Sequence, residues 1–76
     1  MPRYFFDITR GDETFPDEEG IELPDIETVR RQARRSAKRI LPTLPERSPN
    51  QTFIVRDEAG HIVLTLDIKA SANLPI

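Results

Sequence analysis

DIETVRRQARRSAKRIL, residues 25–41, is the stretch that decides the fold, because no other segment has sustained helical periodicity. At about 100° per residue, its apolar side chains fall within an arc of roughly 120°, the width of a core-facing stripe. The stripe consists of Ile26, Val29, Ala33, Ala37, Ile40 and Leu41. Asp25 is placed to cap the first turn, and Pro42 ends the helix. The sequence therefore predicts an amphipathic helix on which the flanking strands pack.

Cations occupy most of the rest of this helix: Arg30, Arg31, Arg34, Arg35, Lys38 and Arg39. Arg30 differs in position, since it falls inside the apolar arc at about 40° past Ile26. A guanidinium there must extend past the edge of the core or bind a carboxylate. We therefore expect Arg30 to be partly buried and to form a structural ion pair. Its expected partners are a nearby backbone carbonyl or one of three carboxylates: Asp7, Glu22 and Asp67.

Charge is unevenly distributed along the 76 residues, although the formal net charge is only −2. Residues 1–24 contain two cations and seven acids, residues 25–41 contain six cations and two acids, and residues 42–76 contain three cations and four acids. Such separation of acidic and basic residues is evidence about how the protein associates with other molecules. The chain has no Cys, which excludes disulfides and thiolate metal sites. It has neither an apolar run of about 18 residues nor a secretory signal, so we expect a cytoplasmic location and no membrane partner.

The segment before the helix predicts up to three short strands: residues 3–9, 13–15 and 20–23. In the first of them, alternation places one set of apolar side chains on the helix side: Tyr4, Phe6 and Ile8. A two-residue loop at residues 10–11 would place Phe6 opposite Phe15 and bring Phe15 into the core.

The segment after the helix predicts a hairpin, with strands at residues 52–56 and 61–68 and a loop at residues 57–60. The loop sequence, Asp-Glu-Ala-Gly, is typical of a type I turn that closes on a glycine. With a loop of that length, the expected cross-strand pairs are Val55 with Ile62, Phe53 with Leu64, and Ile54 with Val63.

These elements predict one α+β domain over residues 1–69. An antiparallel sheet of three to five strands carries one amphipathic helix on one face, in the order strand–(strand–strand)–helix–strand–strand. The core residues expected from the sheet are Tyr4, Phe6, Ile8, Phe15, Phe53, Val55, Ile62, Leu64 and Leu66, with Ile68 extending them. We expect residues 42–50 to form a stiff surface connection and residues 70–76 a disordered tail.

Three segments, PRYFFD at residues 2–7, DEEGIELPD at 17–25 and DEAGHIVLTL at 57–66, together resemble a small bacterial family of single-domain proteins of unknown function. The resemblance covers most of the chain and implies a free-standing domain with a β–α–β–β layout. It carries over no functional residues, because that family has no assigned activity. The order of elements also resembles, more loosely, the partner-binding half of HicB-type antitoxins, which is a likeness of fold alone.

Residues with catalytic or metal-binding potential are few. His61 is the one histidine, and without Cys it completes neither a metal site nor a nucleophile–base pair. The acidic run at residues 12–19 lacks the spacing of a calcium loop, and Pro16 interrupts it. No motif positions a pair of carboxylates for acid–base work. We therefore expect no enzymatic activity, catalytic residue, metal site, cofactor or identifiable small-molecule substrate.

Three apolar residues point away from the helix by strict alternation: Phe5, Ile54 and Val63. Three such side chains on one outward sheet face exceed scattered exposure, and such patches commonly mark association sites. The sequence therefore favours a domain that acts through protein association, with itself or with a protein partner. The alternative for this patch is a small cluster that the acidic loop or the tail covers.

A second hypothesis is a nucleic-acid-binding or antitoxin-like regulator that uses the basic face of the helix. Its candidate residues are Arg31, Arg34, Arg35 and Lys38. The net negative charge, the lack of an exposed aromatic residue beside the cations and the acidic residues 1–24 argue against it. We expect nucleic-acid binding to be weak or absent at physiological salt, because the acidic segment repels the same polyanion.

Overall fold

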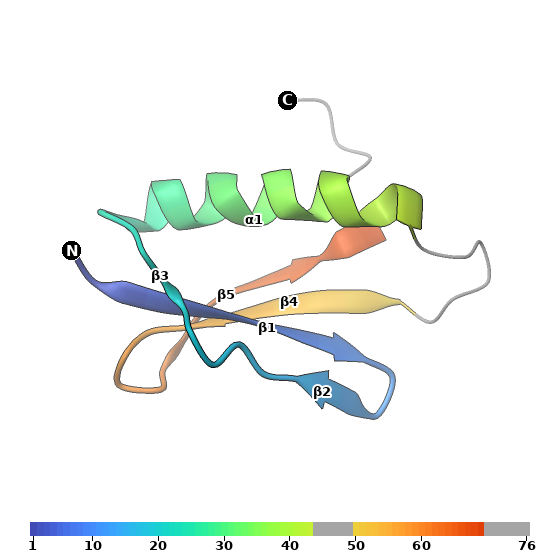
Figure 1. The fold of residues 1–76 in the computed structure, drawn as a ribbon, viewed down its shortest axis with the longest axis horizontal. Helices are drawn as coiled ribbons and strands as arrows, with labels where there is room; N and C mark the ends of the chain where they lie inside the picture. Colours follow the sequence, from blue (N-terminus) through green and yellow to red (C-terminus); the bar gives the residue numbers. More distant parts are fainter. Residues whose placement is uncertain (44–49, 70–76) are drawn as a thin grey trace.

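The computed structural model describes residues 1–43 and 50–69, which form an α+β fold in two layers (Figure 1). The elements are β1 (Arg3–Arg10), β2 (Glu13–Phe15), β3 (Ile21–Glu22), α1 (Ile26–Ile40), the 3₁₀ helix η1 (Leu41–Thr43), β4 (Gln51–Arg56) and β5 (Ile62–Asp67). In these residues the sheet has five antiparallel strands, with β2, β1, β4 and β5 side by side. β3 pairs with β1 on the edge away from β4. The predicted fold class is confirmed.

Two expectations fall on residues 44–49 and 70–76, which lie outside the described residues: the central part of the stiff connection and the disordered tail. In the part of the chain that is described, no helix combines the length and the hydrophobicity needed to cross a bilayer.

The helix begins and ends where the sequence predicts. The Asp25 carboxylate accepts hydrogen bonds from the Thr28 backbone N–H at 2.8 Å and from the Thr28 hydroxyl at 2.7 Å. These bonds hold the pKa of Asp25 below its ordinary value, because they favour the charged carboxylate. At the other end, the Leu41 N–H donates to the Ala37 carbonyl.

α1 packs on the sheet through a line of residues at four-residue spacing: Val29, Ala33 and Ala37, all fully buried. Because the two alanine side chains are small, the helix backbone lies close to Phe53 and Leu66 of the sheet. Toward the N-terminal end of α1, Val29 packs in a second cluster with Tyr4, Leu23 and Val55. Phe6 contacts both clusters, and its ring meets that of Phe53 edge to face at 6.2 Å. The core is therefore continuous beneath the helix.

The rotation of α1 differs from the prediction at its first turn. Ile26, expected in the apolar stripe, is 39% exposed, whereas Gln32 and Ser36 on the opposite flank are half-buried. Leu23 is buried together with Val29, so the chain entering the helix draws that flank toward the sheet. Ile26 lies about 60° away from Val29 on the helical wheel and is turned out into solvent.

The first hairpin has a different register from the predicted one. Its loop is Gly11–Asp12, and Phe15 lies opposite Ile8 instead of Phe6. Gly11 has φ of +61°, the conformation that two-residue hairpin loops need at their first central position. The register is shifted by two residues, and because side chains alternate with a period of two, Phe15 stays on the helix side of the sheet. The side chain is nevertheless 46% exposed, because β2 is the edge strand and α1 packs mainly on β4 and β5.

The second hairpin is also shifted, and it contains a β-bulge. Val55 pairs with Leu64, Phe53 with Leu66, and Ile54 with Thr65, whereas Arg56 pairs with Ile62. The extra residue is Val63, which packs against the helix-side cluster. Ile62, expected in the core, is instead 64% exposed. The predicted inward position of Ile62 and the predicted outward position of Val63 were therefore both wrong.

The register shift has two sources: the loop is longer by one residue than predicted, and the bulge at Val63 adds a second residue. The Asp57 carboxylate accepts from the N–H groups of Ala59 and His61, at 3.0 and 2.9 Å. The Asp57 N–H in turn donates to the His61 carbonyl at 2.9 Å. These bonds draw His61 into the loop and hold the pKa of Asp57 below its ordinary value, chiefly through the His61 N–H.

The turn after β2 is built around Asp17. One carboxylate oxygen accepts from the Phe6 N–H at 3.1 Å, in the gap along β1 between β2 and β3. The other oxygen accepts from the N–H groups of Glu19 and Gly20, at 3.2 and 3.1 Å. The Asp17 side chain thus supplies the hydrogen bond that a strand would otherwise make to β1. The turn places Gly20 directly against β1, with φ of +71°.

Candidate interaction surfaces

The first candidate surface is the outer sheet face, the side of the sheet opposite α1. Cross-strand pairing arranges it in three rows: Phe5, Arg56 and Ile62, then Asp7, Ile54 and Thr65, then Thr9, Thr52 and Asp67. Among the described residues no helix covers this face (Figure 1). The acidic turn at residues 17–20 covers its β1 end in part, since the Asp17 N–H donates to Asp7 and Gly20 packs against the Phe5 ring. The face is a mixed surface of apolar side chains, threonines and one central ion pair.

That ion pair joins Asp7 of β1 to Arg56 of β4. The Arg56 Nε and Nη2 atoms donate to the two carboxylate oxygens, a bidentate arrangement. The Asp7 side chain is only 10% exposed and also accepts from the Asp17 N–H at 2.9 Å. The Arg56 guanidinium lowers the pKa of Asp7, and the Asp17 N–H adds to this effect, against the opposing effect of burial. The centre of the outer sheet face is therefore internally neutral.

The apolar part of the outer sheet face consists of Phe5, Ile54 and Ile62. Phe5 and Ile54 are half-buried, and the Arg56 guanidinium lies 5.3 Å above the Phe5 ring. Of the predicted interface residues, Phe5 and Ile54 lie on this face as expected. Val63 does not, because the loop that is longer by one residue turns it toward the helix. Ile62 takes its place and is the most exposed of the three.

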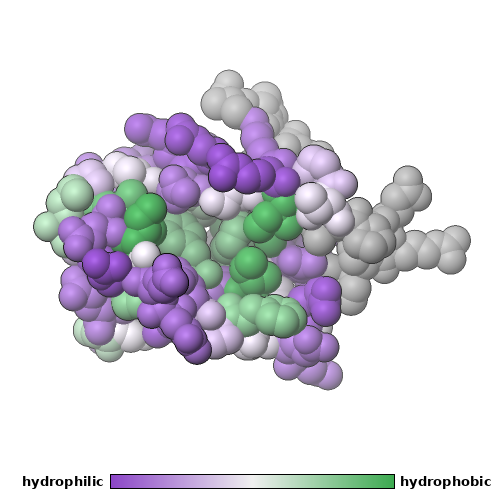
Figure 2. All heavy atoms as spheres, in the orientation of Figure 1, coloured by the Kyte–Doolittle hydropathy of each residue, from purple (hydrophilic) through white to green (hydrophobic). Residues whose placement is uncertain are grey.

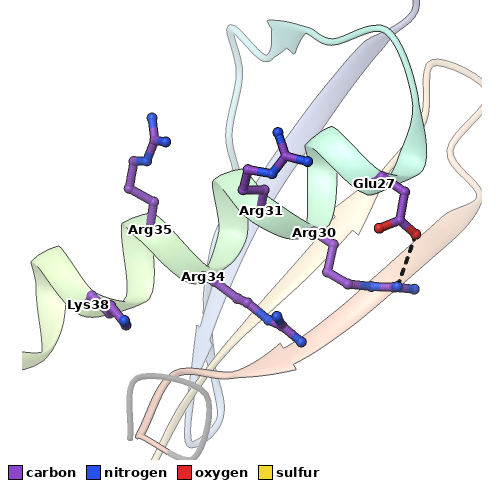
Figure 3. A pocket seen from close by; sticks show the side chains of 6 residues that line it. All are labelled: Glu27, Arg30, Arg31, Arg34, Arg35 and Lys38. Atoms are coloured by element: carbon purple, nitrogen blue, oxygen red, sulfur yellow. Dashed lines mark hydrogen bonds and ion pairs between the residues drawn. The ribbon is translucent and has the colours of Figure 1, made fainter. Parts of the chain in front are cut away.

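The second candidate surface is the cationic groove on the solvent side of α1 (Figure 3). It has a volume of about 410 Å³ and is lined by Glu27, Arg30, Arg31, Arg34, Arg35 and Lys38. Arg31 and Arg35 extend to one side of the helix, and Arg30 and Arg34 extend to the other. All four predicted nucleic-acid candidates therefore line one groove, which has a local charge of +4 from five cations and one acid.

Arg30 belongs to this groove and not to the core, contrary to the prediction. It is exposed, and its Nη1 atom lies 3.2 Å from Oε1 of Glu27 in an ion pair on the helix surface. The rotation of α1 that exposes Ile26 also turns Arg30 outward. The predicted carboxylate partners bond elsewhere: Asp7 to Arg56, Glu22 to Arg3 and Asp67 to Asn50.

Like charges are concentrated along the groove. Arg30 and Arg34, Arg31 and Arg35, and Arg34 and Lys38 are each four residues apart on α1. Such pairs repel each other and destabilise a helix by about 0.2–0.5 kcal/mol each. Glu27 is the one acid that lines the groove, and it pairs with Arg30. The groove therefore has unneutralised positive charge that an anion would stabilise.

A third feature is an open edge of the core between α1 and the near strands. Figure 2 shows hydrophilic residues along the helix and hydrophobic residues in the band beneath it. Phe15 of β2 and Ile21 of β3 contribute exposed apolar surface on this side of the sheet. The Arg10 guanidinium covers part of this surface, at 5.5 Å from the centre of the Phe15 ring.

In the described residues, no cluster of three or more His, Asp or Glu side chains could hold a metal ion. His61 is exposed, and its Nδ1 atom lies 3.6 Å from Asp57 within the hairpin loop. The expectations of no catalytic residue and no cofactor remain predictions.

Two residues that shape the outer sheet face were missed from the sequence. Asp17 is predicted only as part of the acidic run, although an Asp in a connecting segment is a common source of side-chain to backbone bonds. Ile62 is predicted in the core, because the two-residue period of a strand cannot reveal where the loop ends.

The family model for the domain of unknown function DUF6894 matches residues 3–69, and the chain belongs to this family. The match spans every strand and helix described above. Comparison with the curated proteins and with the solved structures gives no significant match.

Proposed function

We propose that this DUF6894 domain has no catalytic role and acts by protein association, as a weak homodimer formed through the outer sheet face. The observation that carries the proposal is Ile62, a large apolar side chain that is 64% exposed on the outer sheet face. The same face carries the half-buried Phe5, separated from Ile62 by Arg56, and the half-buried Ile54 in the next row. Clustered apolar exposure of this kind favours association more than isolated exposed residues do.

The charge of the outer sheet face supports a second copy as the partner. A two-fold dimer requires a surface that is complementary to itself. Asp7 and Arg56 neutralise each other within one chain, so two copies of this face meet without net repulsion. The remaining side chains in the rows of β4 and β5 are apolar residues and threonines, with Asp67 at the margin.

The size of the face sets the expected strength. A sheet of about four strands and six residues covers roughly 400 Å² in projection. This area is roughly half of the 800 Å² that each partner buries in an interface of standard size. We therefore expect a dimer that forms only at high protein concentration.

The test compares the wild type with Ile62→Lys and with Ile26→Lys. Ile26 is also an exposed isoleucine, but it lies on α1, away from the outer sheet face. Sedimentation equilibrium from about 10 μM to about 1 mM covers the affinities expected of so small an interface. We expect the mass to rise toward that of a dimer for the wild type and Ile26→Lys, and to stay monomeric for Ile62→Lys. A wild type that is monomeric throughout, or two variants that behave alike, would overturn the proposal.

A further inference from the structure

We infer that the cationic groove of α1 binds the phosphate backbone of a double-stranded nucleic acid, independently of its base sequence. The groove is lined only by charged side chains, five of them cationic. The apolar surface of the groove comes from the carbon stems of these charged side chains, and among the described residues no aromatic or aliphatic residue lines it. A protein interface is normally anchored by such residues at its centre. A phosphodiester backbone needs only cations, and arginine forks match phosphate oxygens in bidentate geometry.

The arrangement of the cations fits a linear polyanion. Arg31 and Arg35 extend to one side of the helix, and Arg30 and Arg34 to the other, so the groove has a cationic wall on each side (Figure 3). From Arg31 to Lys38, the helix advances by about 10 Å at 1.5 Å per residue. Phosphates on one strand of a duplex are spaced about 3.4 Å apart along its axis, so the groove spans about three spacings, which is about four phosphates.

The structure also weakens the objection that the acidic segment repels a polyanion. β2 and the turn that follows it lie on the opposite side of β1 from α1 (Figure 1). Several acids of residues 1–24 bond to cations or backbone N–H groups within the chain: Asp7 to Arg56, Glu13 to Arg10, Asp17 to Phe6 and Glu22 to Arg3. Solvent and salt screen the remaining charge over about 8–10 Å. The field over the groove is therefore dominated by its own cations.

The chemistry of the groove selects duplex over single strand. Proteins that hold single strands stack the bases on aromatic side chains. The groove has no aromatic lining residue, so its contacts are confined to phosphates. Such binding is electrostatic, weak and steeply dependent on salt.

The test measures binding of a fluorescein-labelled 20-base-pair DNA duplex to the full chain by anisotropy, from about 50 to about 200 mM salt. Four phosphate contacts give a log–log slope of about −3.6, so the affinity should fall about 150-fold over this range. Replacing Arg31 and Arg34 with Gln removes two contacts and should reduce the slope to about −1.8. The matched control replaces Arg10 and Arg39 with Gln, which changes the net charge equally outside the groove. The control should keep the wild-type slope.

Competition with unlabelled ligands distinguishes the possible sources of negative charge. Duplex RNA should compete about as well as duplex DNA, because both present phosphates to the groove. Poly-glutamate of equal charge should compete much less well. Three results would overturn the inference: no binding at 50 mM salt, equal slopes for the two double variants, or equal competition by poly-glutamate. The last would assign the groove to an acidic protein segment.

Discussion

Gly20 is the glycine at which an added methyl group should damage the fold most. Its φ of +71° lies in the left-handed region, which costs an L-residue about 1–2 kcal/mol. A Cβ atom at this position would lie 2.9 Å from each of three atoms: Arg3 Cγ, Phe5 Cε1 and the Tyr4 carbonyl oxygen. The carbonyl oxygen is part of the backbone of β1, so it cannot move without disturbing the pairing with β3. The steric conflict adds about 1–3 kcal/mol, the usual cost of overpacking.

Gly20→Ala should therefore lower the free energy of unfolding by about 2–5 kcal/mol. A domain of this size has a total of only about 4–11 kcal/mol. Gly11→Ala is the matched control, because Gly11 has a similar φ of +61° and nothing within 4 Å of an added Cβ atom. The control should lose only about 1–2 kcal/mol. The difference between the two variants isolates the steric contact with β1.

Urea unfolding followed by circular dichroism measures both free energies, and thermal unfolding checks them at roughly 4–8 °C per kcal/mol. Equal losses for the two alanine variants would refute the reasoning, since they would mean that the turn at Gly20 does not pack against β1. A loss at Gly11 larger than that at Gly20 would refute it as well.

Two further predictions concern charge. Asp7→Asn should lower the free energy of unfolding by about 1.5–3 kcal/mol at pH 7, because the bond to Arg56 loses its charge. The pKa of Asp7 is lowered in the native state, so the pair stabilises fully above the unfolded-state value of about 3.9 and loses its effect as the pH falls through the native value. The gap between wild type and variant should hence narrow in unfolding experiments near pH 3, and a constant gap would contradict the assignment. Arg34→Gln should raise the free energy of unfolding by up to about 1 kcal/mol at low salt, since it removes repulsion from Arg30, Arg31 and Lys38. This gain should vanish near 1 M salt, where charges are screened within about 3 Å; because Arg and Gln have similar helix propensities, a gain that persists would contradict the repulsion argument.

The helix was predictable because its determinants are local. Asp25, the four-residue spacing of Val29, Ala33 and Ala37, and the proline after Leu41 all act within one or two turns of the chain. The existence and order of the strands followed from alternation and turn residues in the same way. The positions of Phe5 and Ile54 on the outer sheet face also followed, because β1 and most of β4 pair without irregularity.

The errors arose where a side chain bonds to the backbone or where two elements fix each other. Asp57 lengthens the second loop by one residue, and one residue is enough to exchange the faces of Ile62 and Val63. The position of Arg30 depends on how α1 rotates on the sheet, and Leu23 helps to fix that rotation from outside the helix. Neither effect leaves a periodic signal in the sequence.

The two proposed surfaces lie on opposite sides of the domain, so each can bind while the other is occupied. A dimer formed through the outer sheet face would have the two sheets at its centre and the two α1 helices outside. The cationic grooves would then face away from each other, and one straight duplex could not contact both. Dimerisation would therefore place two independent phosphate-binding grooves on one particle, which favours bridging of two duplexes over tighter binding to one.

Because the two surfaces are on opposite sides, loss of the dimer through Ile62→Lys leaves the groove intact, and loss of the groove leaves the sheet face intact. Sedimentation equilibrium therefore tests the dimer and DNA-binding anisotropy tests the groove, and neither result decides the other.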